Sequence, residues 1–226
     1  MSEIARLSGR RALITGEDLD LAERLGVLFA SCGATVELEP TDGISDGTSI
    51  ARAAARRLGG LDVLVNTGMS TAPETDPGAR SRAARREVEG VLERSMSLLV
   101  TTTEAALPSM GSGASIINTA AFSASEPVLT PGQEALATAV VETTQGWAVT
   151  LGPRRIRVNA VVGGPRWHPE LESRLDHGHT PEQPADEEEL DAFVYLASGG
   201  SRNVSGSVLA VARVLTVEEL RIPTEF

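Results

Sequence analysis

The sequence predicts an α/β fold in which helices flank a doubly wound parallel sheet. Short apolar runs rich in β-branched residues, such as RALIT (11–15) and LDVLVN (61–66), alternate with stretches of helical periodicity. This alternation requires right-handed crossovers and a parallel sheet that is covered on both faces. The chain has 226 residues, of which 41% are hydrophobic, and it contains no internal repeat. We therefore expect one domain spanning residues 1–226, built around one sizeable core.

The first half of the chain gives a clear order of elements. The helix after the first strand carries Leu21, Leu25 and Phe29 on one face and ends at Gly33. The next strand ends at Pro40, which cannot donate to a continuing ladder. The predicted elements of this half are strands at 11–15, 34–40 and 61–66 and helices at 19–32 and 49–59.

The second half continues the same alternation after a long helix. The predicted elements are helices at 80–107, 133–151 and 184–198 and strands at 115–120, 156–162 and 205–213. Residues 165–185 form a polar, proline-bearing stretch between a strand and a helix. Long loops at the carboxyl ends of such strands cover the ligand crevice, so we expect residues 165–185 to be a cleft-covering loop.

Charge and cysteine content exclude several classes of function. The formal net charge is −11, which disfavours nucleic acid or an anionic membrane as a partner because both require a basic surface. No apolar run reaches the roughly 18 residues of a membrane span, and the first residues lack the apolar stretch of a signal peptide. Cys32 is the only cysteine, so neither an intrachain disulfide nor a cysteine-based zinc site can form. These observations predict a cytoplasmic protein.

Several segments together resemble the short-chain dehydrogenase/reductase family. They include ALITG (12–16), LDVLVN (61–66), SIIN (115–118) and IRVNAVVGG (156–164). The resemblance covers nearly the whole chain and implies a Rossmann-like sheet. The chain is shorter than a usual member, with almost no room between Glu39 and the adenine-side Asp46. This implies that the second helix of the first βαβ unit is deleted.

The resemblance also locates the family's catalytic positions. Counting back from the IRVN segment places the family serine on Ala121 (or the preceding alanine), the tyrosine on Gln133 and the lysine on Ala137. The active-site asparagine position falls on Ser95. Gln133 has no acidic proton to exchange with an alcohol, and a methyl group cannot bind a ribose hydroxyl. These positions predict a chain without the usual dehydrogenase machinery.

The turn that would hold the cofactor phosphates is also altered. In the family pattern TGxxxGxG, this chain keeps Gly16 but places Asp20 and Ala22 at the later glycine positions. Asp18 lies in the same turn, and Glu17 adds a third acid. Carboxylates about 4–6 Å from a pyrophosphate would repel it by kcal/mol-scale energies. Asp18 or Asp20 would instead cap the following helix, and we expect no NAD(P) cofactor.

Other residues could carry chemistry in the old cleft. Ser123 follows the family serine position, and Glu134 lies at the start of the predicted tyrosine helix. His168 lies in the long loop, where a His-x-His pair also occurs, but the loose spacing predicts no metal site. Tyr195, within the apolar run of the last helix, is expected in the core. Ser123, Glu134 and His168 are the candidate catalytic residues that remain.

Three hypotheses for function follow. The first is a non-catalytic subunit that forms a homo-oligomer, or a hetero-oligomer with an active homologous dehydrogenase, through the helices at 80–107 and 133–151. The second is a cofactor-independent lyase, cyclase or dehydratase that acts on an apolar small molecule in the old cleft. The third is an NAD(P)-dependent oxidoreductase with a rearranged site. The sequence favours the first and identifies no substrate or partner.

Overall fold

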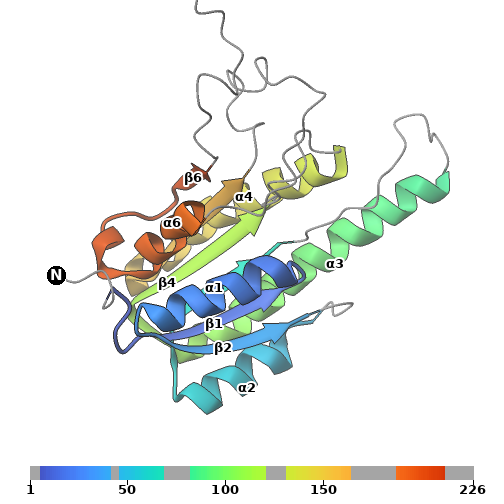
Figure 1. Ribbon diagram of the computed structural model, residues 1–226. Coiled ribbons are helices and arrows are strands. Elements are labelled where there is room, and N and C mark those ends of the chain that lie inside the picture. Colours follow the sequence, from blue (N-terminus) through green and yellow to red (C-terminus); the bar gives the residue numbers. More distant parts are fainter. Residues whose placement is uncertain (1–5, 42–45, 69–81, 121–130, 164–186, 212–226) are drawn as a thin grey trace, which may run out of the picture.

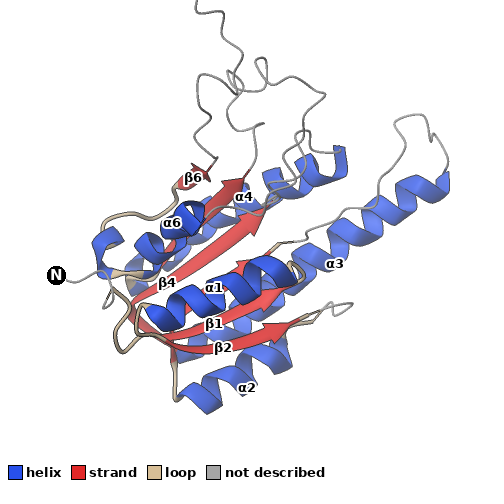
Figure 2. Ribbon diagram, in the orientation of Figure 1, coloured by secondary structure: helices blue, strands red, loops and turns tan. Residues whose placement is uncertain are grey.

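The protein is an α/β sandwich of a single six-stranded sheet between two layers of helices (Figure 1). A computed structural model describes residues 6–41, 46–68, 82–120, 131–163 and 187–211. Within them the strand order is β2-β1-β3-β4-β5-β6, and every neighbouring pair is parallel (Figure 2). The predicted doubly wound, Rossmann-like parallel sheet is confirmed.

The elements lie close to their predicted positions. The strands are β1 (Arg11–Gly16), β2 (Thr35–Pro40), β3 (Leu61–Thr67), β4 (Met110–Ala120), β5 (Arg157–Gly163) and β6 (Val208–Val211). The helices are α1 (Leu19–Ser31), α2 (Thr48–Leu58), α3 (Arg82–Ala106), α4 (Pro131–Leu151) and α6 (Glu187–Ala197). The predicted cleft-covering loop at 165–185 lies outside the described residues.

The side chains of β1 divide the core into two parts. Ala12 and Ile14 pack with α1 and α6 on one face of the sheet, whereas Leu13 packs with α2, α3 and α4 on the other. All three side chains are fully buried. This burial explains why the strand is a continuous apolar run, because alternate residues face opposite helical layers. β1 is therefore covered by helices on both faces, and its carboxyl end is at Gly16.

β2 is the edge strand of the sheet, and this position explains the short chain. In the usual Rossmann arrangement a further strand lies outside the second one. Here the described residues between Pro40 and Leu61 form only α2, which leads directly into β3. The predicted loss of a helix is therefore confirmed, and the described residues form no strand outside β2. Arg57 of α2 forms ion pairs with Glu37 and Glu39 of the exposed edge, and such edge charges discourage pairing with another strand.

The last helix corrects one expectation. Phe193, Val194, Leu196 and Ala197 of α6 are buried, but Tyr195 is 41% exposed. A helix turns about 100° per residue, so one residue of an apolar run can face solvent while its neighbours face the sheet. Tyr195 is therefore not a core residue. Among the described residues no helix is long and apolar enough to cross a membrane.

Candidate functional site

A hollow opens at the carboxyl ends of β1, β3 and β4. The ends of β1, β3 and β4 form its floor, and α3 and α4 form its walls. Most of the polar lining comes from the strand ends, whereas the helices supply the apolar lining and the hydroxyl of Ser95. The lining residues are Thr15, Gly16, Glu17, Asn66, Thr67, Gly68, Ser95, Leu98, Leu99, Thr119, Leu136 and Val140.

The hollow lies at the topological switch point of the sheet. β1 continues through α1 to β2 on one side, whereas β3 continues through α3 to β4 on the other. The two connections therefore diverge above the carboxyl ends of β1 and β3 and leave a crevice there. Ligands of open α/β sheets bind in such a crevice.

Gly16 allows the closest backbone approach at this point. Its φ is +145°, a conformation that residues with a side chain rarely adopt. A Cβ atom at this position would overlap the carbonyl oxygen and side chain of Thr67 on the neighbouring strand. Gly16 is thus required by the geometry of the turn between β1 and α1, and it keeps the start of this turn free of side chains.

Buried amides and hydroxyls fix the floor of the hollow. The Nδ2 atom of Asn66 donates to Oδ1 of Asn118 at 2.8 Å, and Nδ2 of Asn118 donates to the hydroxyl of Thr144 on α4 at 2.9 Å. The backbone N–H of Gly68 donates to Oγ1 of Thr119 at 2.8 Å. This chain of hydrogen bonds ties β3, β4 and α4 together beneath the hollow, so its polar floor is rigid.

Asp18 caps α1 from within the protein. Its Oδ1 atom accepts the backbone N–H of Leu21 at 3.1 Å, and the residue is only 6% exposed. The pKa of Asp18 is raised to about 6, mainly by burial and also by the charge of Asp20, which together outweigh the lowering effects of the Leu21 hydrogen bond and of Arg24. The predicted helix cap is confirmed for Asp18. Its carboxyl group is therefore committed to the helix start and is not among the lining residues of the hollow.

The other two acids of this turn differ in position. Asp20 is exposed and lies 3.9 Å from Arg24 one helical turn later. Glu17 lines the hollow, and its Oε2 atom accepts the hydroxyl of Ser95 at 3.1 Å. Ser95 belongs to α3, 78 residues further along the chain. The structure thus joins Glu17 to Ser95, the residue expected at the position of the family's active-site asparagine.

The remaining predicted site residues fall into two groups. Ala137, which was expected at the family lysine position, is 1% exposed and packs with Leu99, Leu136 and Val140. Ala22 is buried against the core on α1. Three of the predicted positions lie outside the described residues, namely Ala121, Ser123 and His168. The structure describes the backbone of Gln133 and Glu134 at the start of α4 but not their side chains. Within the described part of the chain no group of three His, Cys, Asp or Glu could hold a metal ion.

Asp46, the expected adenine-side residue, lies at the start of α2. Its Oδ1 atom accepts the backbone N–H of Thr48 at 2.8 Å. Hydrogen bonds from the Thr48 hydroxyl and from its backbone N–H lower the pKa of Asp46. The neighbouring Gly47 donates its N–H to the Thr101 hydroxyl on α3 at 2.9 Å, so this turn is tied to the same helix that supplies Ser95.

The residue types of a Tyr–Lys pair are nearly absent from this chain. The sequence contains no lysine, so all 20 Lys+Arg residues are arginines, and Tyr195 is its only tyrosine. Tyr195 lies on α6 and is not among the lining residues of the hollow. The pairing of Glu17 with Ser95 was not foreseen, because no local pattern relates residues so far apart in sequence.

Comparison with known proteins gives the family. A sequence profile described as enoyl-(acyl carrier protein) reductase matches residues 16–213, which is most of the chain. The chain belongs to the short-chain dehydrogenase/reductase family. An uncharacterized oxidoreductase, YhdF of Bacillus subtilis, is 26% identical over 250 residues, covering 91% of this chain and 83% of the relative. NADPH-dependent aldehyde reductase 1 of Arabidopsis thaliana is 28% identical over 200 residues, covering 73% and 68%.

Solved structures share the fold. A short-chain type dehydrogenase/reductase from Mycobacterium marinum has a TM-score of 0.71 at 24% identity, covering 94% of this chain and 98% of the other. A short chain dehydrogenase from Burkholderia cenocepacia, solved in complex with NADP, has a TM-score of 0.65 at 22% identity, covering 92% and 98%. Members of the family commonly form oligomers.

These findings correct the expected function. The hypothesis of a non-catalytic partner subunit without NAD(P) is wrong, because the matching family and the relatives above are oxidoreductases. The structure supplies a physical reason for the error. All three acids of the turn were counted as repelling a phosphate, although Asp18 or Asp20 was also expected to cap the helix; in the structure Asp18 is the buried cap and Asp20 faces solvent. Only Glu17 lines the hollow.

Proposed function

We propose that this protein is an NAD(P)-dependent oxidoreductase with a rearranged site, which interconverts a small carbonyl compound and its alcohol. The observation that carries the proposal is the hollow at the switch point, with Gly16 at its base and Ser95 on its wall. A nicotinamide cofactor would supply the hydride. The proposal is supported by the names of relatives, which include an NADPH-dependent aldehyde reductase and a glucose and ribitol dehydrogenase of Daucus carota.

The residues around the hollow fit part of a dinucleotide. Gly16 leaves room for close approach at the turn, and the start of α1 directs its helix dipole toward the same end of the sheet. Thr119, Asn66 and the backbone of Gly68 offer fixed polar groups on the floor. Glu17 is the one element of the described lining that opposes a phosphate.

The proton in this reaction needs a donor other than a Tyr–Lys pair. Ser95 and Glu17 are hydrogen-bonded to each other at the wall of the hollow and are candidates for this role. Ser123, Glu134 and His168 are the further candidates from the sequence. The apolar side chains of Leu98, Leu99, Leu136 and Val140 suit the hydrocarbon part of an apolar small-molecule substrate.

The test is a combined binding and turnover assay. NADH and NADPH are titrated separately, and oxidation of each is followed with hexanal, D-glucose and a crotonyl thioester; ribitol is tested with the oxidised cofactors. We expect saturable binding of at least one dinucleotide and turnover of at least one carbonyl or polyol. Absence of binding for both cofactors at millimolar concentration, together with no turnover, would contradict the proposal.

We also propose that the protein self-associates, or pairs with a related subunit, through the helices at 80–107 and 133–151. Val149 of α4 is 79% exposed, and Ala135 and Thr138 lie on the exposed side of the same helix. An exposed apolar side chain such as Val149, with small residues on the same helix, can be covered by a second chain. Val149→Arg should lower the molar mass measured by light scattering. Val27→Arg on α1, where the valine is 74% exposed, is the matched control and should not change it.

A further inference from the structure

We propose that Asn66 is a binding residue of the hollow, whose side-chain oxygen accepts a hydrogen bond from a hydroxyl group of the substrate. This inference rests on the proposed function, since it concerns the substrate of the same site. Asn66 lies near the carboxyl end of β3, lines the hollow and is only 5% exposed. An amide in such a place can present either its oxygen or its nitrogen to a ligand, and its neighbours decide which.

The nitrogen of the Asn66 amide is committed to the protein. Its Nδ2 atom donates to Oγ1 of Thr103 on α3 at 3.2 Å and to Oδ1 of Asn118 on β4 at 2.8 Å. Thr103 and Asn118 are fully buried, so water does not compete for these two hydrogen bonds. A primary amide has two N–H donors, and with both in use its oxygen is the group left for a ligand.

The oxygen of Asn66 lies beside a second polar group that also lacks a partner. Thr15 is the Cα partner of Asn66 in the β1–β3 ladder, so both side chains extend from the same face of the sheet, and both residues line the hollow. Within the described part of the chain no group donates to Asn66 Oδ1, and the buried Thr15 hydroxyl has no hydrogen-bond partner. A ligand hydroxyl can donate to the first group and accept from the second, whereas a carbonyl cannot donate to Asn66. This pair therefore favours a hydroxylated substrate.

Thr144 fixes the orientation of both amides from the far side of the network. The Nδ2 atom of Asn118 donates to Oγ1 of Thr144 on α4 at 2.9 Å, which leaves the Asn118 oxygen facing Asn66. Thr144 is fully buried and is not among the lining residues of the hollow. It is thus a positioning residue, which acts on the ligand through Asn118 and Asn66.

The first test is Thr144→Val, which removes the hydroxyl and keeps the branched shape. The Asn118 amide loses its acceptor, and because an orphaned buried N–H is less tolerated than an orphaned carbonyl, we expect both amides to reverse. Asn66 then turns its N–H groups toward the hollow. Its side-chain amide protons, followed by NMR of the 15N-labelled protein, should exchange with water roughly tenfold faster than in the wild type or more.

Two further variants control this measurement. Thr144→Ser keeps the hydroxyl and should keep slow exchange. Thr150→Val removes an exposed hydroxyl of the same helix, which donates to the carbonyl of Gly146 outside the network, and should also leave the rate unchanged. Fast exchange of the Asn66 amide protons in the wild type itself, or an unchanged rate in a folded Thr144→Val protein, would overturn the proposed orientation. The wild-type result decides the matter if the valine variant does not fold.

The second test compares acetoin with 2-butanone, two ketones that differ by one hydroxyl group. Each is titrated with and without NADH and NADPH. We expect the wild type to bind acetoin roughly tenfold more tightly, as for one added hydrogen bond, and only acetoin should shift the NMR signals of the Asn66 amide. The preference should be lost in Thr144→Val and kept in Thr144→Ser. Equal affinities, no binding of either ketone, or a shift of Asn66 by the dinucleotides alone would contradict the role of Asn66 in binding the substrate.

The outcomes for Asn66 and for the proposed function are distinguishable. If neither dinucleotide binds and neither ketone is reduced, the oxidoreductase function fails, although a shift of Asn66 by acetoin would still show a hydroxyl-binding site. If both ketones are reduced equally well, and Thr144→Val leaves their ratio of kcat/KM unchanged, only the role of Asn66 fails. Preferred reduction of acetoin that is lost in Thr144→Val supports both.

Discussion

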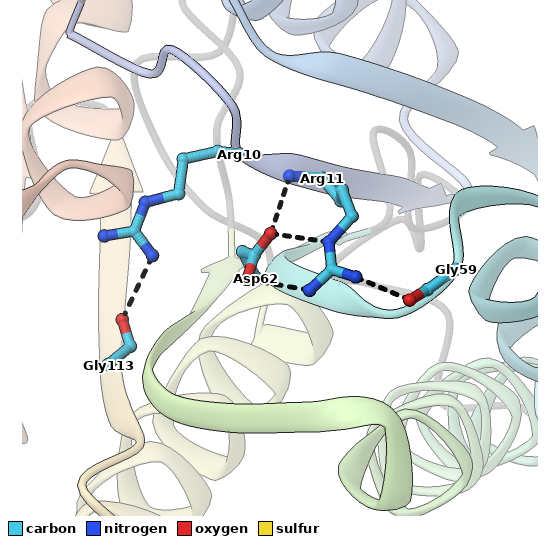
Figure 3. A network of polar contacts seen from close by, with 5 residues as sticks. All are labelled: Arg10, Arg11, Gly59, Asp62 and Gly113. Atoms are coloured by element: carbon cyan, nitrogen blue, oxygen red, sulfur yellow. Dashed lines mark hydrogen bonds and ion pairs between the residues drawn. The ribbon is translucent and has the colours of Figure 1, made fainter.

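The two ends of the sheet differ in the charged side chains that bind the ends of the helices. At the carboxyl ends of the strands lie Glu17, Asp18 and Asp46, around a hollow with a polar floor. At the amino ends lie arginines whose guanidinium groups are hydrogen-bonded to backbone carbonyls. Figure 3 shows part of this second region, where Arg11 and Arg10 meet the chain near Gly59 and Gly113. One end of the sheet is open, and the other is closed by hydrogen bonds.

Several arginines at the closed end donate hydrogen bonds to backbone carbonyls at the ends of helices. Arg11 donates to the carbonyl of Gly59 after α2 at 2.6 Å, and Arg154 donates to that of Leu107 after α3 at 2.7 Å. Arg157 donates to the carbonyls of Leu196 and Ser198 at the end of α6, at 2.8 and 3.2 Å. The last carbonyls of a helix lack intrahelical partners and carry the negative end of its dipole. An arginine therefore supplies these carbonyls with a hydrogen-bond donor and with a positive charge.

The direction of the helices explains why charge is sorted in this way. Each helix of a parallel α/β sheet runs opposite to its strands, so helix starts gather at the carboxyl ends of the strands and helix ends at the amino ends. Asp18 and Asp46 bind backbone N–H groups at the starts of α1 and α2. Part of the acidity near the hollow is therefore structural, which is why counting acids in the sequence overstated the repulsion of a cofactor.

The largest expected effect is at the closed end, for Arg157→Ala. Arg157 is 7% exposed and bonds the Ser201 hydroxyl as well as two carbonyls. Truncation removes these hydrogen bonds and leaves a cavity, so we expect a loss of about 2–4 kcal/mol in the free energy of unfolding. Urea denaturation measures it, with the exposed Arg202→Ala as control. A loss no larger than that of the control would show that these hydrogen bonds do not hold the closed end.

The second largest expected effect is a gain in the free energy of unfolding, and it concerns the open end of the sheet. Because the folded-state pKa of Asp18 is raised to about 6 from an ordinary value of 3.8, its ionisation destabilises the fold. The free energy of unfolding of the wild type should therefore fall as the pH rises from 3.8 to about 6, the interval between the two pKa values of Asp18. Asp18→Asn keeps an N-cap side chain and should be more stable by about 1–3 kcal/mol above pH 6. Urea midpoints of the two proteins, compared across pH, test this; a constant difference would contradict it.

The smallest effect is expected for Asp62→Asn at the closed end. Asp62 accepts the backbone N–H of Arg11 at 3.0 Å and its Nε at 2.8 Å (Figure 3). The hydrogen bond from the Arg11 side chain lowers the pKa of Asp62. The stability that the Asp62 carboxylate contributes is thus fully present above its unfolded-state pKa near 4. It is lost as the pH falls through the lower folded-state pKa. The variant should lose about 1 kcal/mol at neutral pH, and its difference from the wild type should shrink in acid. A pH profile parallel to that of Asp18→Asn would refute the contrast between the two ends.

The fold was predictable because local pattern and tertiary environment agree in this chain. The run at 11–15 is apolar on both faces because both faces of β1 are covered, and Gly33 and Pro40 mark the ends of α1 and β2 as expected. The missing helix could be read from the short spacing after Glu39. Tyr195 shows the limit: four of its neighbours are buried, but an apolar run does not reveal which residue of a helix faces away from the sheet.

The site was only partly predictable, because its contacts join distant segments. Asp18 could be recognised as a cap from its place before a helical pattern. The contact between Glu17 and Ser95 spans 78 residues, and the hydrogen bond between Asn66 and Asn118 spans 52. The sequence named Glu17 and Ser95 separately, as altered motif positions, but gave no sign that they meet. The function was misjudged for the same reason, since residue identities alone did not show which acids face the hollow.

The missing outer strand also changes how the chain can assemble as it is made. β1 pairs with β2 and with β3, and all three strands are complete once Thr67 has been synthesised. Without an intervening strand and helix, the segment between Gly16 and Leu61 that must close to form the β1–β3 ladder is shorter, which lowers the entropy cost of loop closure. Since contacts close in sequence form faster, we expect the β2-β1-β3 unit with α1 and α2 to be the first part to fold, before α4 and α6 leave the ribosome.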